Sequence, residues 1–429
     1  MIKISKYDAV ENDIFVRLGD KTNVETTVAD IIKDVRENGD AAIVRYTRKF
    51  DKAELTSLEV TAEELSRAVK SADPKLIEIL KKAAKNIEAF HRCQLREGFV
   101  INGDDGIVLG QRVLPIEKVG VYVPGGTASY PSTVLMNCIP AKLAGVRELI
   151  LATPPSPDGT VSPDILAAAA IGGADRIFKV GGAQAVAALA YGTETVPRVD
   201  KIVGPGNAYV AEAKKQVFGQ VAIDMIAGPS EILVIADNTA NAEFVAIDML
   251  SQAEHDTMAS AVLVTTSADL AEKVAAEIER QLKALPRRDI ARASIDNNGK
   301  IIIAESLEQA IEISNALAPE HLEICVDNPF DYLDEVKNAG SVFLGHFCPE
   351  ALGDYFAGPN HTLPTHGTAR FSSPLSVDDF IKKTAFTYYT PEALSHVGGD
   401  IAYFAGKEGL DAHARSVAVR LEQERKKLI

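Results

Sequence analysis

From residue 118 onward, short apolar runs that end in Gly or Pro alternate with segments of helical periodicity. The runs form two successive groups, first 119–126, 148–155, 176–182 and 201–207, and then 231–237, 260–266, 300–306, 321–326 and 340–345. Buried strands have this length and these boundaries, and strands that alternate with helices build parallel βαβ units. The pattern predicts an α/β fold with two Rossmann-like domains, one inserted in the other.

The first hundred residues are predicted to be mainly helical. The segment 27–51 has helical periodicity that is broken at Gly39. The segment 61–94 opens with Thr61 and Glu64, whose spacing is that of a capping box at a helix start. These helices precede the first predicted strand.

The chain is predicted to become helical again from about residue 374. Thr390 and Pro391 are a favourable N-cap and first helical residue, and a Gly-Gly pair and Gly409 are expected to divide the segment into short helices. We expect an N-terminal arm (1–20), a first α/β domain with a helical N-terminal part (21–113 and 232–373), an inserted second α/β domain (114–231) and a C-terminal helical tail (374–429).

Composition and charge limit the partners. The chain has 429 residues and a formal net charge of −15, which argues against nucleic acid and against a basic membrane-binding face. No run approaches the ~20 apolar residues of a membrane-spanning helix, and no targeting segment is visible at the N-terminus. The four cysteines form no CxxC pair, as is typical of a reducing compartment. We expect a cytoplasmic protein.

Glycines follow the predicted strands of the first group, at 125–126, 181–182 and 204–206. Ligands of parallel sheets bind beyond the carboxyl ends of the strands, where glycine permits close backbone approach. Each pair also fits an ordinary strand-to-helix turn. Because neither GxGxxG after a strand nor GxxxxGK[ST] occurs, a nucleotide site must be built differently.

Four histidines have acidic or amide neighbours in sequence. They are His255 after Gln252, His321 after Glu320, His361 after Asp354 and His413 after Glu408. Gln252 and His255 lie three apart near a helix end, so both face one side and can reach one ion. Imidazole, carboxylate and carbonyl groups are suitable zinc ligands. We expect His91 and His396, in helical stretches among surface residues, to be structural, and His346 and His366 to lie in loops, with no obvious partner in the sequence.

Several long motifs resemble the histidinol dehydrogenase family. They are "IDMIAGPSEILVIAD" (223–237), "SQAEHD", "APEHLEI", "GDYFAGPNHTLPTHGTARFSSPLSVDDF" (353–380) and "EGLDAHARSVAVRLE" (408–422), and they follow the family's order from about residue 20 to the C-terminus. The resemblance implies oxidation of L-histidinol through histidinal to L-histidine with two NAD molecules. It also implies one zinc ion per subunit.

By the same resemblance, zinc is held by Gln252, His255, Asp354 and His413, and the ion anchors the substrate's amino and imidazole nitrogens. Glu408 resembles the carboxylate that holds the substrate, with Ser230 and His361 as further contacts. Glu320 and His321 resemble the catalytic pair, in which His321 takes the alcohol proton and Glu320 activates water for the aldehyde step. Tyr122, Gln184 and Asn207 match the family's NAD contacts. The family's C-terminal tail crosses a homodimer, which implies shared active sites.

Three alternatives compete with this interpretation. In the first, Cys138 or Cys348 attacks the aldehyde, although neither has a His nearby in sequence and Cys138 lies in a predicted buried helix. A related dehydrogenase acting on another polar alcohol, such as a sulfonated diol, would need a cation where this chain has Glu408. A zinc-binding protein without turnover would have no use for Glu320 and His321.

Overall fold

The structure, a computed structural model, describes residues 2–7, 24–125 and 130–427. They form two compact units. The larger contains Met1–Gln94 and Ile116–Phe380, and the smaller contains Leu95–Pro115 and Ile381–Ile429. Within the described ranges no helix is long and apolar enough to cross a membrane.

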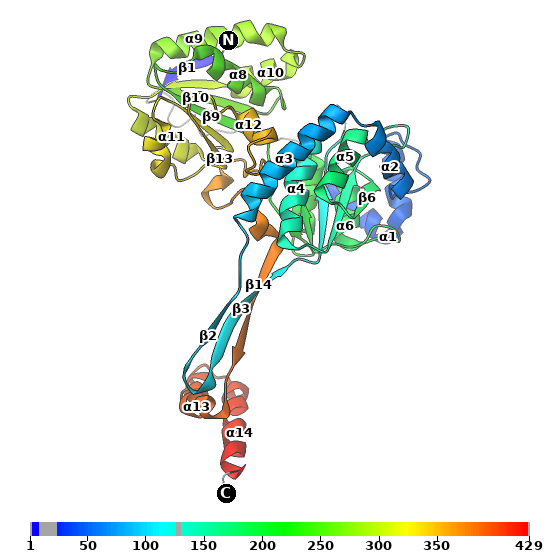
Figure 1. Ribbon diagram of the computed structural model, residues 1–429, viewed down its shortest axis with the longest axis vertical. Coiled ribbons are helices and arrows are strands. Elements are labelled where there is room, and N and C mark those ends of the chain that lie inside the picture. The colour runs from blue at the N-terminus through cyan, green and yellow to red at the C-terminus, as the bar shows by residue number, and fades with distance from the viewer. Residues whose placement is uncertain (1, 8–23, 126–129, 428–429) are drawn as a thin grey trace. The chain divides into compact units, whose positions relative to one another are not determined.

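Two parallel sheets form the larger unit (Figure 1). One has the order β6-β5-β4-β7-β8, with β4 Lys118–Tyr122, β5 Glu148–Thr153, β6 Arg176–Lys179, β7 Lys201–Val203 and β8 Ala222–Ile223. The other has the order β1-β11-β10-β9-β12-β13, with β1 Lys3–Lys6, β9 Glu231–Ala236, β10 Ser260–Thr265, β11 Lys300–Ile303, β12 His321–Cys325 and β13 Ser341–Leu344. We call them the β4 sheet and the β9 sheet.

Both sheets are doubly wound in the same way. Chain order runs outward from β4 through β5 to β6 and then returns to β7 and β8, and β9 to β13 repeat this pattern. The connecting helices are α4 Pro131–Ala144, α5 Pro163–Gly172, α6 Gly182–Tyr191, α7 Ala208–Val217, α8 Ala242–Ala253, α9 Ala268–Gln281, α10 Arg288–Asn298 and α11 Leu307–Leu317. The predicted α/β class with parallel sheets is confirmed, because the apolar runs are strands buried on both faces.

The N-terminal helices are α1 Glu25–Phe50, α2 Ala62–Ser71 and α3 Pro74–Arg92. The predicted break in α1 is confirmed, since Gly39 has a φ of 50° and kinks the helix. The capping box is also confirmed: the Glu64 amide donates to the Thr61 hydroxyl at 3.1 Å, and the Thr61 amide donates to the Glu64 carboxylate at 2.7 Å.

These helices pack differently from the expected grouping with residues 232–373. Helix α1 contacts α6 and α7, α2 contacts α5, and α3 contacts α4 and α5. The four contacted helices, α4 to α7, all connect strands of the β4 sheet. The reason is the apolar face of α1, where Val28 and Ile43 share one buried core with Phe178 of β6. Strand β1, which was not predicted, instead joins the β9 sheet by pairing with β11.

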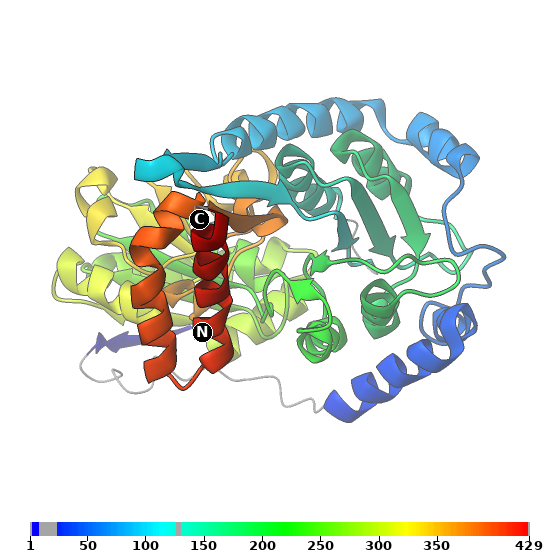
Figure 2. The same cartoon turned by 90° about the horizontal axis from the view of Figure 1, so that it is seen from below.

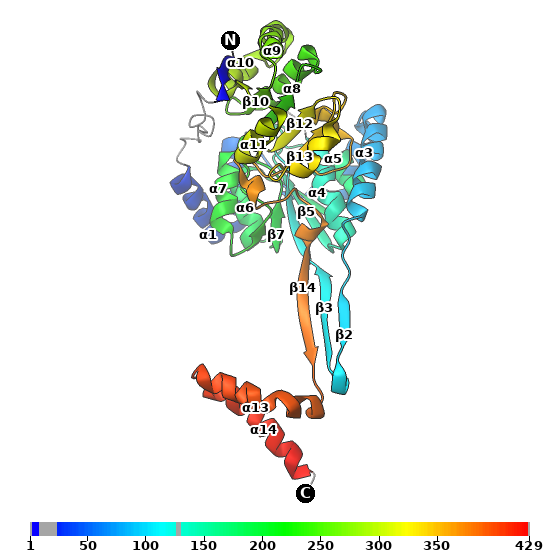
Figure 3. The ribbon, with the colours of Figure 1, turned by 90° about the vertical axis from the view of Figure 1, so that its left-hand side faces the viewer.

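The smaller unit is an antiparallel ribbon joined to a helical pair (Figures 2 and 3). Strands β2 Phe99–Asn102 and β14 Ile381–Tyr388 both pair with β3 Val108–Pro115, and α13 Pro391–Lys407 packs against α14 Asp411–Lys427. The sequence did not predict these strands, because nearly every residue of β2 and β14 is exposed and no buried alternation marks them. The predicted C-terminal helices are confirmed by α13 and α14, and the strand β14 precedes them.

The predicted helix start at Thr390 is confirmed, since its hydroxyl accepts the Ala393 amide at 3.1 Å. The Gly-Gly break is wrong, because α13 runs through both glycines. Gly398 instead allows close approach of α14, as a Cβ there would lie 2.6 Å from Leu421. Gly409, with a φ of 75°, does separate the two helices.

Candidate active site

A buried cluster lies at the amino ends of two adjacent strands, β9 and β12. His321 is the first residue of β12 and pairs with Ile232 of β9, beside Glu231, the first residue of β9. Glu320 immediately precedes β12 and is also buried. The sequence predicted ligand residues at the carboxyl ends of the strands. For this pair that prediction is wrong, and the amino edge of the β9 sheet carries the cluster.

The His321 ring is oriented by the backbone. Its Nδ1 lies 3.0 Å from the Glu231 carbonyl oxygen, which can only accept, so Nδ1 carries the proton and Nε2 has the lone pair. Nε2 is buried without a hydrogen-bond partner in the described part of the chain, and it lies 4.0 Å from Asp354 Oδ1. Burial lowers the pKa of His321 to about 4, so the ring is neutral at pH 7.

Glu320 is held by the neighbouring strand. Its Oε2 accepts the Glu231 amide at 2.9 Å and lies 3.7 Å from His321 Nδ1. Burial raises the pKa of this carboxyl well above its usual range, and the charges of Glu231 and Asp354 raise it further. A carboxylate in such surroundings is a stronger base than one in water.

Gln252 and His255 come from the C-terminal end of α8, as predicted. Gln252 is fully buried and fits with its amide nitrogen donating to Glu350 Oε2 at 2.9 Å and its oxygen accepting the Glu231 amide at 3.0 Å. His255 is exposed, and its charge contributes, after the larger effect of burial, to lowering the pKa of His321 and of His361. His255 thus lies in the turn that follows α8, three residues after Gln252 in the last turn of the helix.

Asp354 lies on α12 Glu350–Tyr355, a single short helix. Its carbonyl oxygen is 3.1 Å from His361 Nδ1, and one of its carboxylate oxygens is 3.9 Å from the same nitrogen. Glu350, four residues earlier, points to the same cluster, with Oε1 3.8 Å from His321 Nδ1. The sequence analysis missed Glu350, although its spacing from Asp354 was a usable signal.

The cluster has a donor set that fits a divalent metal. In the described part of the chain, His321, Glu350 and Asp354 offer ligand atoms that all lie within 4.8 Å of one another. With its amide turned the other way, the Gln252 oxygen would face only acceptor atoms of Glu350. That orientation is stable where a cation lies between the oxygens, and amide, imidazole and carboxylate donors suit zinc.

The remaining predicted substrate residues are distributed over both units. Ser230 directly precedes β9, and its carbonyl oxygen accepts the Ser260 amide at 3.0 Å. Glu408, which caps the C-terminus of α13, and His413, in α14, are both exposed and belong to the smaller unit. The structure therefore groups Gln252, His255, Glu320, His321, Asp354 and His361, and leaves the contribution of Glu408 and His413 as a prediction.

The predicted NAD residues lie at the carboxyl edge of the β4 sheet. Tyr122 ends β4, and its buried hydroxyl accepts the Gly182 amide at 3.0 Å. Gln184 is buried in the first turn of α6, and Asn207 caps α7 by accepting the Tyr209 amide at 3.1 Å. Gly204, with a φ of 111°, approaches Tyr122 so closely that a Cβ would lie 2.1 Å from its carbonyl oxygen.

Two helix N-termini and a glycine turn thus surround Tyr122, an arrangement that fits the pyrophosphate of a dinucleotide. A buried ion pair that the sequence analysis missed supports the turn. Asp224 Oδ2 accepts the Gly204 amide at 2.7 Å, and the Lys214 ammonium, paired with Asp224, donates to the Gly204 carbonyl at 2.9 Å.

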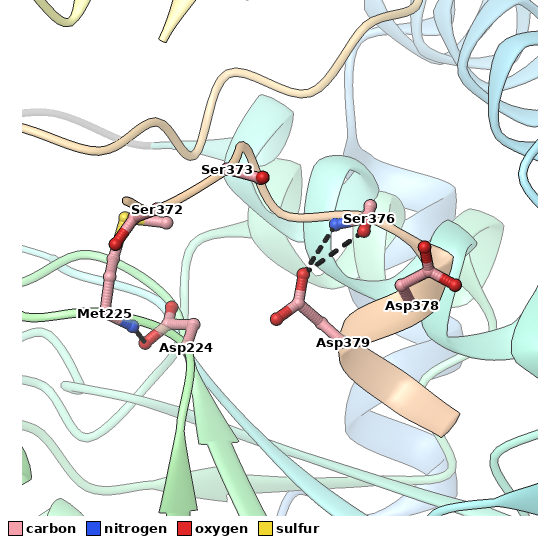
Figure 4. A pocket seen from close by; sticks show the side chains of 7 residues that line it. All are labelled: Asp224, Met225, Ser372, Ser373, Ser376, Asp378 and Asp379. Carbon is pink, nitrogen blue, oxygen red and sulfur yellow. Dashed lines mark hydrogen bonds between the residues drawn. The ribbon is translucent and has the colours of Figure 1, made fainter. Parts of the chain in front are cut away.

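A cavity of about 360 Å³ adjoins this ion pair (Figure 4). It is lined by Asp224, Met225, Ser372, Ser373, Ser376, Asp378 and Asp379. The Asp379 carboxylate accepts the Ser376 amide at 2.9 Å and pairs with buried Lys201 at 3.0 Å. No predicted catalytic or ligand residue lines the cavity, so we treat its acidic groups as structural.

The other histidines have partners. His91 is buried rather than at the surface, with Nδ1 2.7 Å from Gln94 Oε1, so its structural role holds but its expected position is wrong. His346, for which the sequence showed no obvious partner, lies 3.3 Å from an Asp327 carboxylate oxygen. The His366 ring packs against Gly228.

The cysteines do not resemble nucleophiles. Cys138 is fully buried in α4, and burial raises the pKa of its thiol to about 12. Cys348 is half-buried and lies two residues before α12.

Comparison with known proteins agrees with this geometry. The family description "Histidinol dehydrogenase" matches residues 17–421. The chain is 57% identical over 404 residues to histidinol dehydrogenase of Clostridium acetobutylicum, covering 94% of each chain, and 54% identical over 426 residues to that of Geobacter sulfurreducens, covering 98% of this chain and 99% of that one. A crystal structure of histidinol dehydrogenase from Elizabethkingia anophelis superposes with a TM-score of 0.93 at 42% identity, covering 99% of this chain and 98% of the other.

These matches place the chain among the oxidoreductases. It belongs to the histidinol dehydrogenase family.

Proposed function

We propose that this protein oxidises L-histidinol through histidinal to L-histidine, the last steps of histidine biosynthesis, with transfer of two hydrides to two NAD molecules. Family membership supports the reaction. The observation that carries the assignment of residues is the buried lone pair of His321 Nε2, which faces Asp354 beside Glu320. Bound zinc would hold the substrate's amino and imidazole nitrogens, and bound NAD would accept the hydride.

His321 takes the proton of the alcohol group. The Glu231 carbonyl fixes the tautomer with Nδ1 protonated, so Nε2 is the atom that accepts the proton as hydride leaves the neighbouring carbon. The neutral ring that burial maintains is the form that a base requires. This step converts the alcohol to the aldehyde and yields one reduced NAD and one proton.

Glu320 takes a proton from the water that adds to the aldehyde. The aldehyde carbon has no hydroxyl group, so it becomes a hydrate before it can lose a second hydride. Addition of water across the carbonyl supplies the second carboxylate oxygen, and His321 then accepts the hydrate's hydroxyl proton. Glu320 is suited to the first proton transfer because burial makes its carboxylate a stronger base.

One zinc ion per subunit would be held by Gln252, His255, Asp354 and His413. Gln252 is buried and Asp354 half-buried in the cluster of the larger unit, His255 is exposed in the turn after α8, and His413 lies on an exposed position of α14. Ser230, His361 and Glu408 are the further substrate contacts. The negative charge of Glu408 suits a substrate that carries an amine and disfavours an anionic one.

The cofactor residues Tyr122, Gln184 and Asn207 would hold NAD at the carboxyl edge of the β4 sheet. The Gly182 amide, the glycine turn at Gly204 and the start of α7 support this assignment, since each offers backbone that a pyrophosphate can approach. We place the enzyme in the cytoplasm, where NAD and amino-acid precursors are available.

A homodimer with shared active sites explains why Glu408 and His413 belong to the smaller unit. That unit exposes the apolar side chains Phe99, Val100, Ile101, Tyr388, Tyr403 and Phe404. Exposed apolar residues in such number are typical of an interaction surface. In the dimer, His413 and Glu408 of one chain complete the site of the other.

The central test measures NADH absorbance with histidinol and NAD, before and after chelation of metal. We expect two NADH per histidinol, loss of activity on chelation and recovery on addition of zinc. Activity on other polar alcohols but not on histidinol would contradict the substrate, and activity that survives complete metal removal would contradict the zinc site.

Shared sites are tested by complementation. An inactive Glu320→Gln/His321→Ala chain is exchanged with an inactive His413→Ala chain, and we expect mixed dimers to regain at most about half of native activity. As a matched control, His321→Ala exchanged with Asp354→Asn should stay inactive, because both residues come from the larger unit. No recovery in the first mixture would show that His413 serves its own chain.

A further inference from the structure

Glu323 is a fully buried acid in the middle of an apolar strand. Every residue of β12, from His321 to Cys325, is buried. The Glu323 carboxyl is contacted by one backbone amide, one thiol and one further carboxyl, none of which is a cation. Burial of an acid without a cation costs free energy, and an apolar side chain would pack in the same place. The packing of the sheet therefore gives no reason for a glutamate here.

Glu323 and His321 lie on the same face of the β9 sheet, because they are two residues apart on one strand. Cys325, the next residue on that face, shares a buried core with Met249 of α8. Leu322, between them in sequence, belongs instead to the core that α11 covers. Glu323 thus lies behind His321 on the face of the sheet that α8 covers.

The first polar contact of Glu323 holds helix α12. Its Oε1 accepts the Glu350 amide at 2.8 Å, and Glu350 is the first residue of that helix. Asp354 lies one turn further along the same helix face. Because α12 has only 6 residues, the position of its first turn sets the position of Asp354.

The second polar contact of Glu323 holds helix α8. The carboxyls of Glu323 and Asp248 hydrogen-bond to each other. Burial raises the pKa of Glu323 well above its usual range, so Glu323 carries the proton and Asp248 accepts it in the hydrogen bond. Asp248 lies four residues before Gln252, and residues at this spacing share one face of a helix.

A third contact joins the two helices to each other. The Gln252 amide donates to Glu350 Oε2 at 2.9 Å, and Glu350 Oε1 lies 3.8 Å from His321 Nδ1. Helix α8, strand β12 and helix α12 therefore each carry one site residue and one acid a single repeat away from it. Glu323 is the acid that contacts both helices.

We propose that Glu323 is a positioning residue, which fixes α12 and α8 against β12 so that Asp354 and Gln252 meet beside His321. This role rests on the proposed zinc site and reaction. Groups behind metal ligands orient those ligands, and their loss costs about 10- to 100-fold in metal affinity or activity. Glutamine can make both hydrogen bonds of Glu323, because it accepts through its oxygen and donates through its nitrogen, whereas leucine replaces only its bulk.

The test compares Glu323→Gln and Glu323→Leu with the native full-length protein. Zinc affinity of the metal-free protein is measured by competition with a chromophoric chelator, without histidinol or NAD. We expect Glu323→Leu to weaken zinc binding and to raise the KM for histidinol, each about tenfold or more, with the KM for NAD changed less than about twofold. Glu323→Gln should stay within about threefold of the native protein in both, since it keeps both hydrogen bonds.

Asp248 supplies a second measurement that does not require a change in the buried strand. Asp248 is half-buried, and Asp248→Ala removes only the link to α8. We expect it to weaken zinc binding about threefold or more, as the loss of one hydrogen bond implies, and Asp248→Asn to restore most of the loss. If Glu323→Leu does not yield folded protein, this pair of variants decides the question.

Glu279→Leu is the matched control. Glu279, on α9, accepts from Arg292 of α10 at 2.7 Å, so it joins two helices of the same sheet without contacting the site. We expect this variant to unfold at a lower temperature while its zinc affinity and its KM for histidinol stay at the native values. It thus shows what a purely structural loss does to the same measurements.

Three results would overturn the proposal. One is native zinc affinity and native KM for histidinol in both Glu323→Leu and Asp248→Ala. Another is equal losses in the glutamine and leucine variants, which would show that the hydrogen bonds are not what matters. The third is a KM for NAD that rises as much as the KM for histidinol, as a general loss of structure would produce.

Failure of the wider assignment gives a different result. A native protein that binds no zinc or forms no NADH from histidinol contradicts the proposed function, whatever the variants do. A native protein that does both, with Glu323 and Asp248 variants that behave as it does, contradicts only the role of Glu323.

Discussion

The β4 sheet and the β9 sheet have the same strand order but carry their candidate sites at opposite edges. Around Tyr122 the groups at the carboxyl edge are helix N-termini, at Gly182 and Asn207. Around His321 the groups at the amino edge include the C-terminal end of α8, with Gln252 and His255. Helix N-termini favour anions and helix C-termini favour cations.

The comparison teaches that strand order alone does not decide where a ligand binds. A parallel sheet has one edge that suits phosphate and one edge that suits a metal ion, and the proposed function uses the first edge of the β4 sheet and the second edge of the β9 sheet. The prediction with the largest expected effect therefore concerns the amino edge of the β9 sheet. The general rule for parallel sheets expects no ligand site at that edge.

His321→Ala should have the largest effect. Because His321 accepts a proton in both oxidations, we expect kcat to fall about 10²- to 10⁴-fold for histidinol and for histidinal alike. Rates are measured from NADH with each substrate. His346→Ala is the control, since that imidazole pairs with Asp327 and has no role in the proposed reaction. A loss of kcat smaller than tenfold would show that His321, at the amino edge, is not the base.

Glu320→Gln should separate the two oxidations. The amide keeps the size of the side chain but cannot take a proton from water, so we expect aldehyde oxidation to fall about 10²-fold or more and alcohol oxidation to fall much less. Single-turnover rates with histidinol and with histidinal measure the two steps. Equal losses would show that Glu320 does not act on water.

His255→Asn and Asp354→Asn should each lower metal affinity by about tenfold or more, because ligand donors are removed from the cluster. Zinc content after dialysis against a graded chelator series, together with the KM for histidinol, measures this effect. His346→Asn is the control, because that imidazole lies beside Asp327 and is not one of the proposed ligands. Full zinc content with an unchanged KM would contradict the assigned ligands.

A pair of helix caps compares the two carboxyl edges directly. Asn207 caps α7 in the β4 sheet, and Asn241 caps α8 in the β9 sheet by accepting the Glu243 amide at 2.8 Å. Alanine at either position should cost about 0.5–2 kcal/mol of stability. Only Asn207→Ala should also raise the KM for NAD. An equal effect of both on NAD would show that the carboxyl edges are not distinct.

The smallest expected effect is a pH-dependent change in stability. Burial raises the pKa of Asp51, which caps the C-terminus of α1, to about 6 in the folded protein, above its ordinary value of 3.8. The stability that this carboxyl contributes is therefore fully present below pH 3.8 and is lost as the pH rises through 6. Asp51→Asn should therefore match native protein near pH 4. At pH 8 it should unfold about 1–3 °C higher, since ~1 kcal/mol shifts Tm by only a few degrees in chains of this size. Parallel melting curves at both pH values would contradict this.

Buried elements could be predicted from the sequence, and exposed ones could not. The strands β4 to β7 and β9 to β13 appear as apolar runs because both of their faces are covered. Strand β14 carries Lys382 and Lys383 and is exposed along almost its whole length. Because neither of its faces is buried, apolar and polar residues need not alternate along it, and the sequence carries no clear sign of a strand.

The candidate site was predicted only in part, for a related reason. Gln252, in the last turn of α8, and His255, in the turn after it, are three apart in sequence, so a shared target could be predicted from their spacing. Glu231 and Glu323 hold the cluster through β9 and β12, where Glu323 accepts the Glu350 amide at 2.8 Å. Such contacts join residues that are distant in sequence, and an acid within an apolar strand carries no local sign of its partner.

The pairing of β3 with β14 joins two strands that are made at very different times during synthesis of the chain. All eight residues from Val108 to Pro115 pair with Ile381 to Tyr388, and a two-stranded hairpin alone is at best marginally stable in water. On the ribosome, β2 and β3 therefore emerge long before their third strand and remain without it while Ile116–Phe380 of the larger unit are made. A chain stopped before residue 381 keeps both sheets of the larger unit but leaves an apolar edge open, and such an edge is a template for aggregation.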